Sequence, residues 1–342
     1  MSERRRRVSL SGRALVGGGL ALAAATAAAT ALAAQHRAVR RAREEARRGY
    51  EDEGLVLPDD LVHHDVSVED GATIHVVERG SGPGLLLLHG MMLSSAVWVH
   101  QLTDLSARHR VVAVDLRGHG RSTSGSRPWD IETMADDVRA VVDALHLRGC
   151  LLVGHSMGGI VALKLAQDLA GTSPSERFCG VVVVSSTPGP TVRLPGWSQW
   201  SQATTPATRR ALLMLERAGA ALAPSEDLRW WLTRFGFGPE PVPAQVRFVE
   251  EVHQAMPIGA FAQLAPMLGG VDLSAGLIDI ELPLLVVVGS HDRLVGPHPA
   301  RRMADVIPQA QLVELPRCGH MPMLERRHEF SRLLEEFCAK VA

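Results

Sequence analysis

Residues 150–159 read Cys-Leu-Leu-Val-Gly-His-Ser-Met-Gly-Gly, and this stretch decides the fold. The apolar run at 151–153 is typical of a buried strand, and the pattern at 159–169 is typical of a helix. Between them stands Gly-x-Ser-x-Gly, which places Ser156 on a sharp turn from strand to helix. The N-terminus of a helix favours negative charge that develops beside it. We therefore interpret Ser156 as a nucleophile.

Other apolar runs predict more strands of the same buried kind. Before them, an alternating pattern around Asp70-Gly71 predicts a β-hairpin. Helical patterns lie between the runs, and alternating strands and helices predict an α/β fold with a mostly parallel sheet flanked by helices. The expected strands are 63–69, 73–79, 85–88, 111–114, 181–184, 284–288 and, more weakly, 311–315, and the expected helices are 131–145, 159–169 and 325–338.

The interval between the strands at 181–184 and 284–288 is too long for a loop. It contains helical patterns at 206–222 and 243–256, so we expect an inserted helical cap over the strand ends. The predicted division is a core at 55–187 and 273–342 with a cap at 188–272. Tryptophans of the cap suggest an apolar lining for substrate, or equally the cap's own core. They are Trp197, Trp200, Trp230 and Trp231.

A serine hydroxyl needs a base to become nucleophilic at neutral pH. His320 lies on a loop just after the last expected strand and before the final helix, from which an imidazole can reach across the strand ends. The acid of such a triad precedes the histidine along the chain. Asp292 follows the strand at 284–288 and is the predicted acid, with Asp115, at the end of an earlier strand, as the reserve candidate.

Negative charge on a reacting carbonyl oxygen needs hydrogen-bond donors. His89-Gly90-Met91 ends a strand and opens a loop, so the backbone N–H groups of Met91 and Met157 are the predicted oxyanion hole. We interpret the neighbouring histidines as residues that brace loops rather than as catalysts; they are His89, His119 and His155.

Five motifs in this order make the chain resemble the α/β-hydrolase superfamily over roughly residues 62–342. They are His89-Gly90 with Ser94-Ser95 and Trp98, the stretch 115–122, the elbow at 154–159, the stretch 289–292, and 319–322. Relatives that use aspartate at the elbow are excluded by Ser156, and those with tryptophan after the nucleophile by Met157. Carboxylesterases, enol-lactonases, carbon–carbon bond hydrolases and cofactor-free haloperoxidase-type enzymes remain open.

The expected function is cleavage of a carboxylic ester, or a related acyl bond, of an apolar small molecule through an acyl-enzyme. Lactone or carbon–carbon bond hydrolysis and perhydrolysis are alternatives with the same triad. A binding module that has lost catalysis and a passive membrane scaffold are others. No metal-binding cluster or phosphate-binding glycine loop stands in the sequence, so no cofactor is expected.

Composition restricts the partners. The chain has 342 residues, 46% of them hydrophobic, and a net charge of −1, so it can form a large core and offers no basic surface for nucleic acid. Its four cysteines lack zinc-binding spacing. They are interpreted as small buried hydrophobic residues, although a disulfide between Cys150 and Cys179 is conceivable because each begins an expected strand.

The first 54 residues are interpreted as a targeting or membrane-anchoring segment rather than as part of the fold. Residues 14–34 carry no charge and are flanked by arginines on both sides. As a helix they span roughly 30 Å, the thickness of a bilayer core. A single membrane anchor is the main interpretation, with the catalytic domain outside the cytoplasm. A cleaved export signal ending at Ala31-Leu32-Ala33 and a soluble extension are alternatives. Residues 37–54 are expected to be a charged helical tether.

Overall fold

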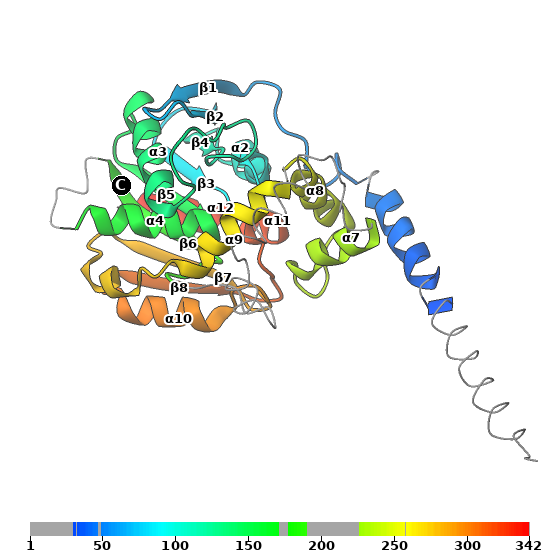
Figure 1. Cartoon of the computed structure of the whole chain (residues 1–342). Helices are drawn as coiled ribbons and strands as arrows, with labels where there is room; N and C mark the ends of the chain where they lie inside the picture. The colour runs from blue at the N-terminus through cyan, green and yellow to red at the C-terminus, as the bar shows by residue number, and fades with distance from the viewer. Residues whose placement is uncertain are drawn as a thin grey trace, which may run out of the picture.

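The computed structural model describes residues 30–31, 33–46, 49–170, 177–189, 226–256 and 258–341. Within these ranges, eight strands form one sheet with helices on both faces (Figure 1). Every expected strand is present, with bounds that differ by at most three residues. The strands are β1 (Val62–Ser67), β2 (Thr73–Arg79), β3 (Gly84–Leu88), β4 (Arg110–Val114), β5 (Cys150–His155), β6 (Phe178–Val184), β7 (Leu284–Gly289) and β8 (Ala310–Leu315).

The strand order is β1-β2-β4-β3-β5-β6-β7-β8. The predicted hairpin is confirmed, since β1 and β2 pair antiparallel, and β2 also pairs antiparallel with β4. From β4 through β8 all pairs are parallel. The carboxyl ends of these parallel strands therefore meet at one edge of the sheet, which is where α/β folds place their reactive groups.

Both faces of the parallel strands are covered, which explains their continuous apolar sequences. All six residues of β5 and all six of β7 are buried. In β3, Leu86 and Leu88 join the apolar cluster on one face, and Leu85 and Leu87 join the cluster on the other. Side chains alternate between the faces of a strand, so a strand covered on both sides is apolar at every position.

Helices on the first face are α3 (Ile131–Ala144), α4 (Met157–Asp168), α9 (Ile258–Gly270) and α10 (Pro297–Val306). Helix α3 begins where the sequence predicts, because the Asp130 side chain accepts a hydrogen bond from the N–H of Thr133 at 2.8 Å and so caps the first turn. Its buried residues recur at helical spacing, as in Ile131, Met134 and Val138.

The second face carries the short helix α2 (Val99–Asp104) and the last two helices of the chain. The sequence predicts one final helix at 325–338, and this is wrong in detail. The helix α12 (Arg327–Val341) covers most of the expected range, and a separate short helix, α11 (Pro322–Glu325), precedes it. Arg326, which stands between them, has a φ of −128° and is not helical. The break leaves Glu325 at the end of a short helix, where its carboxylate reaches backbone N–H groups.

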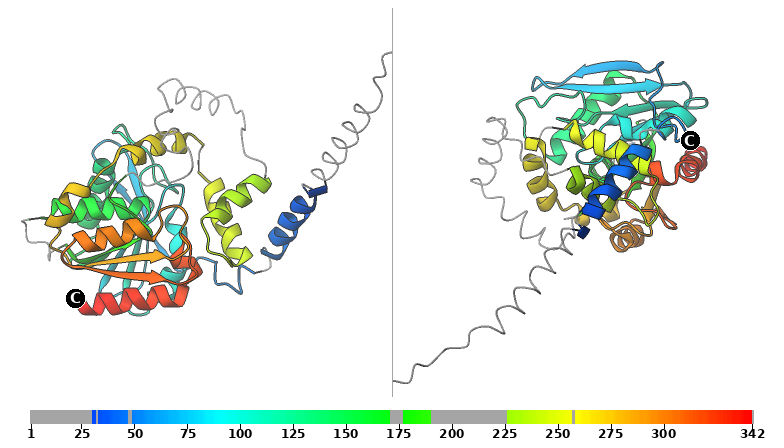
Figure 2. Two further views of the ribbon diagram at one scale, coloured as in Figure 1. Left: turned by 90° about the horizontal axis from the view of Figure 1, so that it is seen from below. Right: turned by 90° about the vertical axis from the view of Figure 1, so that its right-hand side faces the viewer.

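The described part of the insertion comprises α7 (Glu226–Phe235), α8 (Pro243–Gln254) and α9. Helices α7 and α8 lie beside the helix at 33–46, to one side of the sheet (Figure 2). Val39 of that helix is buried in the same apolar cluster as Trp230 and Val246. The helix expected at 206–222 and residues 14–29 lie outside the described residues. The cap and its boundaries stay predictions.

Two further features concern the cysteines and the membrane. Cys150, Cys179, Cys318 and Cys338 are all free thiols, so the structure contains no disulfide between Cys150 and Cys179. Among the described helices, none combines the length and the apolar character that crossing a bilayer requires.

Candidate active site

Ser156 occupies a strained turn between β5 and α4. Its φ of 51° and ψ of −115° are unusual for a residue with a side chain. Close backbone contacts surround it: a Cβ atom on Gly154 would lie 2.2 Å from the oxygen of Gly158, and one on Gly158 would lie 2.4 Å from the oxygen of Leu88. Only glycine fits at both positions, and the turn holds the serine at the carboxyl end of β5.

His320 and Asp292 come from the loops after β8 and β7. His320 Nδ1 and Asp292 Oδ2 lie 2.9 Å apart. The other carboxylate oxygen of Asp292 accepts the N–H groups of Leu294 and Val295, at 2.9 and 3.0 Å. Both side chains are buried, with Asp292 5% and His320 6% exposed. The carboxylate fixes the orientation of the imidazole ring through Nδ1, so the Nε2 atom is not bonded to Asp292.

The charge of Asp292 is favoured by its partners. Burial raises the pKa of this carboxyl, but the His320 ring and the two backbone donors together outweigh burial, so its pKa lies below the ordinary value. A carboxylate that stays ionised can stabilise an imidazolium ion beside it.

The His320 loop lies against the turn that carries Ser156. His155 Nε2 donates a hydrogen bond to the backbone oxygen of His320 at 2.8 Å, and the two ring centres are 4.8 Å apart. Burial holds the pKa of His155 well below its ordinary value, so its ring is a neutral donor. Within the described residues, no hydrogen bond joins the Ser156 hydroxyl to the His320 ring. Such bonds are often long in a site without substrate and shorten when substrate binds.

The N–H groups expected to form the oxyanion hole flank the same turn. Met91 follows β3, and Met157 is the first residue of α4, where a backbone N–H has no partner inside the helix. Neither N–H donates a hydrogen bond in the described part of the chain. A Cβ atom on Gly90 would lie 3.0 Å from the Ser156 Cβ, so the loop passes close to the serine.

Two buried histidines brace the loop that contains Met91. His89 Nδ1 bonds the oxygen of Gly90 at 2.7 Å, and its Nε2 accepts the N–H of Leu116 at 3.0 Å. His119 Nε2 accepts the N–H of Met92 at 3.2 Å. Burial lowers the pKa of His89 to about 4 and that of His119 to about 3. Both rings are therefore neutral at neutral pH, which lets each donate through one nitrogen and accept through the other.

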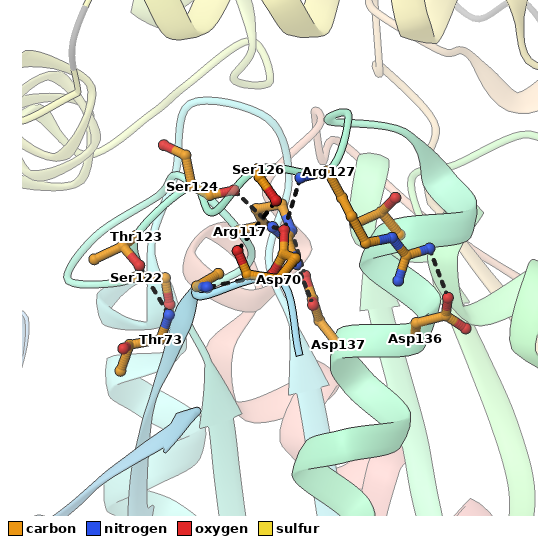
Figure 3. Close-up of polar contacts among 12 residues, drawn as sticks. Asp70, Thr73, Arg117, Ser122, Thr123, Ser124, Ser126, Arg127, Asp136 and Asp137 are labelled. Carbon is orange, nitrogen blue, oxygen red and sulfur yellow. Dashed lines mark hydrogen bonds and ion pairs between the residues drawn. The ribbon is translucent and has the colours of Figure 1, made fainter. Parts of the chain in front are cut away.

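The segment that carries His119 is itself held by buried ion pairs. The Arg117 guanidinium is fully enclosed between two carboxylates, 2.6 Å from Asp70 and 2.6 Å from Asp137 (Figure 3). Asp70 lies in the turn between β1 and β2, and Asp137 lies on α3. The network therefore ties three parts of the chain together behind the site.

Asp115, the reserve candidate for the acid, has a different role. Its carboxylate accepts the N–H of Ser95 at 2.7 Å and that of Arg121 at 2.9 Å. It is thus engaged by loop backbone, and the carboxylate that contacts His320 belongs to Asp292.

The four tryptophans of the predicted cap differ in exposure and in whether the structure describes them. Trp230 is 6% exposed and packs in the apolar cluster that also contains Val39 and Phe248. Trp231 is 47% exposed on the other side of α7. Trp197 and Trp200 lie outside the described residues. A substrate-binding role for these four residues stays a prediction.

Glu325 is a residue of the site that motif analysis does not anticipate. Its carboxylate accepts the N–H groups on both sides of His320, from Gly319 at 3.0 Å and from Met321 at 3.1 Å. It also accepts the N–H of Gly238 from the α7–α8 connection at 2.7 Å. The only sequence signal is its spacing of five residues from His320, which by itself indicates an ordinary helix residue.

A serine on a tight strand-to-helix turn, at the carboxyl edge of a parallel sheet, defines a hydrolase architecture. A profile of the alpha/beta hydrolase family matches residues 85–333. The chain belongs to the alpha/beta hydrolase family, and it is a hydrolytic enzyme.

Individual relatives agree with this assignment. The chain is 31% identical to a pimeloyl-[acyl-carrier protein] methyl ester esterase of Nitrosomonas europaea, over 76% of this chain and 97% of that protein. It resembles the solved structure of a thermophilic esterase from Thermogutta terrifontis with a TM-score of 0.68 and 25% identity, over 82% and 99% of the two chains. A solved membrane phospholipase A matches 94% of this chain and 97% of its own, with a TM-score of 0.64 and 25% identity.

Proposed function

We propose that the chain is a serine hydrolase that cleaves a carboxylic ester of an apolar small molecule, with Ser156, His320 and Asp292 as its triad. The observation that carries this proposal is the buried Asp292–His320 pair on loops that lie against the Ser156 turn. The names of the esterase relatives support an ester as substrate.

The reaction has two halves. His320 Nε2 takes the proton from Ser156 as its Oγ attacks the carbonyl carbon, and Asp292 stabilises the imidazolium ion. The N–H groups of Met91 and Met157 stabilise the oxyanion. The tetrahedral intermediate collapses, the alcohol leaves with the proton from His320, and an acyl-enzyme remains. Water then attacks the acyl carbon by the same route, which releases the acid and restores the serine.

The decisive experiment is Ser156→Ala, assayed with nitrophenyl esters of graded chain length and with a fluorophosphonate probe. Turnover and labelling should both disappear while the circular dichroism spectrum stays unchanged. Ser331→Ala removes another buried hydroxyl, on α12, and is the matched control that should retain both activities. Full turnover in the Ser156→Ala protein would end the proposal. A lactone in the same panel tests the alternative substrate class.

The inserted segment supports the proposed role of a cap over the site. The backbone N–H of His320 donates to the oxygen of Gly236 at 2.6 Å, and Glu325 holds Gly238. The insertion is therefore hydrogen-bonded directly to the loop that carries the proposed base. A shift of the cap would change the position of His320.

We also propose that residues 14–34 anchor the chain in a membrane with the catalytic domain outside the cytoplasm. The uncharged length of this stretch supports the proposal. The membrane phospholipase A match supports it too, because it covers a larger share of the chain than residues 55–342 alone would give. Leu20→Arg with Leu22→Arg should release the chain from sedimented membranes, since two charges oppose insertion. An unchanged membrane fraction would refute the anchor.

A further inference from the structure

Helix α7 presents apolar side chains on its outer face. Trp231, Leu232 and Phe235 are 47%, 62% and 36% exposed, and Leu228, 50% exposed, continues the row. The spacing 228, 231, 232 and 235 places all four on one side of a helix. The buried residues of α7 are Trp230 and, on its inner face, Thr233. The outer face is thus at least as apolar as the inner face, the reverse of what a surface helix requires for solubility.

The first turn of α7 is fixed to the helix at 33–46. His36 Nδ1 lies 2.9 Å from Asp227 Oδ2, and Arg43 Nη1 lies 2.6 Å from Glu226 Oε2. Arg43, which is 8% exposed, also forms a bidentate pair with the buried Glu250 of α8. The left view of Figure 2 shows the blue helix at 33–46 next to the yellow-green helices of the inserted segment. These contacts fix the position of α7 relative to the helix at 33–46.

The position of these contacts along the helix at 33–46 determines how far α7 would lie from a bilayer. His36 is the second residue after Ala34, where the uncharged stretch 14–34 ends. A helix advances about 1.5 Å per residue, so His36 would lie at the level of the lipid headgroups if that stretch enters a bilayer as proposed. Asp227, its partner, would then lie close to that level, and Glu226 of the same turn of α7 pairs with Arg43, two helical turns farther from the uncharged stretch.

Exposed cations accompany the apolar row. Arg37 and Arg41 are exposed on the helix at 33–46, where Arg40 pairs with Glu44 at 3.5 Å, and the guanidinium carbon of Arg293 lies 5.7 Å from the ring centre of Phe235. Arginine near a bilayer surface is attracted by anionic headgroups, and tryptophan and phenylalanine favour the boundary between headgroups and acyl chains. The combination matches an anionic lipid surface better than an uncharged apolar partner.

We propose that Trp231, Leu232 and Phe235 form a lipid-contact face that inserts into the surface of an anionic bilayer. The inference rests on the proposed anchor and is independent of the identity of the ester. It places the inserted segment against the membrane, so the substrate class it favours is an acyl ester that partitions into lipid.

The test uses the full-length chain carrying Leu232→Cys, labelled with an environment-sensitive fluorophore. Ile278→Cys is the matched control, because Ile278 is 57% exposed and apolar but lies on the 3-10 helix Ser274–Asp279, away from α7. Wild-type chain labelled in parallel corrects for the four native thiols, of which three are buried. Vesicles of phosphatidylcholine and phosphatidylglycerol, with and without a spin-labelled lipid, are then added.

The expected result is a blue shift at position 232, with emission quenched by the spin-labelled lipid, and neither change at position 278. A chain that sediments with vesicles but shows no greater quenching at 232 than at 278 overturns the lipid-contact face and leaves the anchor intact. A chain that does not sediment overturns both. A shift at 232 that follows protein concentration without vesicles identifies a second copy as the occupant and also overturns the proposal. Hydrolysis of a soluble ester, measured on the same samples, reports separately on the catalytic proposal.

Discussion

His320 Nδ1 lies 2.9 Å from Asp292 Oδ2, although the two residues belong to loops that follow different strands. A carboxylate accepts hydrogen bonds and cannot donate them, so this contact assigns the ring hydrogen of a neutral imidazole to Nδ1. Nε2 then carries the lone pair. The pair therefore prepares His320 to accept a proton from a hydroxyl, which is the task that the proposed mechanism gives it.

Replacing Asp292 with asparagine should reduce kcat by about four orders of magnitude, because the amide can donate to Nδ1 and so favours the wrong tautomer. The side chains have nearly the same volume, so the fold should survive. Steady-state kinetics on a soluble ester, with circular dichroism on the same preparation, measure both effects.

Asp115→Asn is the matched control, since Asp115 is also buried but accepts N–H groups of Ser95 and Arg121 instead of contacting His320. This change should lower the melting temperature and leave the folded protein with most of its turnover. If Asp115→Asn reduced kcat as far as Asp292→Asn does, the assignment of the acid would be wrong.

The stability of the protein should depend on pH through Asp292. Its pKa is lower in the folded protein than the ordinary value of 3.8, so the folded state favours the ionised form. The resulting stabilisation is present above the ordinary value and is lost as the pH falls through the lowered value. Urea unfolding should therefore show a stability gap between wild type and Asp292→Asn at neutral pH that closes in strong acid. A gap that widened in acid would contradict this sign.

The sheet and the position of Ser156 could be predicted because both depend on neighbouring residues. Strands buried on both faces are apolar at every position, and the Gly-x-Ser-x-Gly turn shows its geometry within five residues. Asp292 could be chosen over Asp115 only by chain order. The structure supplies the physical reason, since the Asp115 carboxylate is already engaged by backbone donors.

Glu325 and the outer face of α7 could not be predicted because their surroundings come from distant parts of the chain. Glu325 meets Gly238 across 87 positions, and Trp231 gains its significance from the attachment of α7 to residue 36. In sequence, Glu325 is one glutamate at the start of a helical pattern. Trp230 and Trp231 are adjacent and chemically identical, yet one is buried and the other exposed.

Arg117→Met should destabilise the protein by about 3–5 kcal/mol, since it leaves the buried Asp137 carboxylate without its counter-charge. Urea unfolding at neutral pH measures the loss. Arg127→Met is the matched control because Arg127 pairs with Asp136 where both side chains are roughly half exposed (Figure 3). Solvent screens that exposed pair, so its loss should destabilise the protein far less than the loss of Arg117. Equal losses in the free energy of unfolding of the two variants would show that the buried ion pairs of Arg117 contribute no more to stability than an exposed pair does.

Glu325→Gln should lower kcat by about 10- to 100-fold with little change in KM, because small displacements of a reacting group are costly to catalysis. The carboxylate accepts the N–H groups of Gly319 and Met321, which flank His320, and that of Gly238. A glutamine offers one oxygen and one N–H₂ group, so a backbone donor is left facing another donor. The loop that carries the imidazole should then shift.

Glu329→Gln is the matched control, since Glu329 pairs with Arg326 near the surface and does not contact the His320 loop. The pH profile separates positioning from mere stability. Burial raises the pKa of Glu325 above its ordinary value, so the wild-type side chain loses its acceptor charge at a higher pH than an exposed glutamate would. The activity ratio of wild type to Glu325→Gln should thus be greatest at neutral pH and should fall towards one in mild acid. A ratio that stays constant over this range, or a loss no larger than that of Glu329→Gln, would assign Glu325 to packing alone.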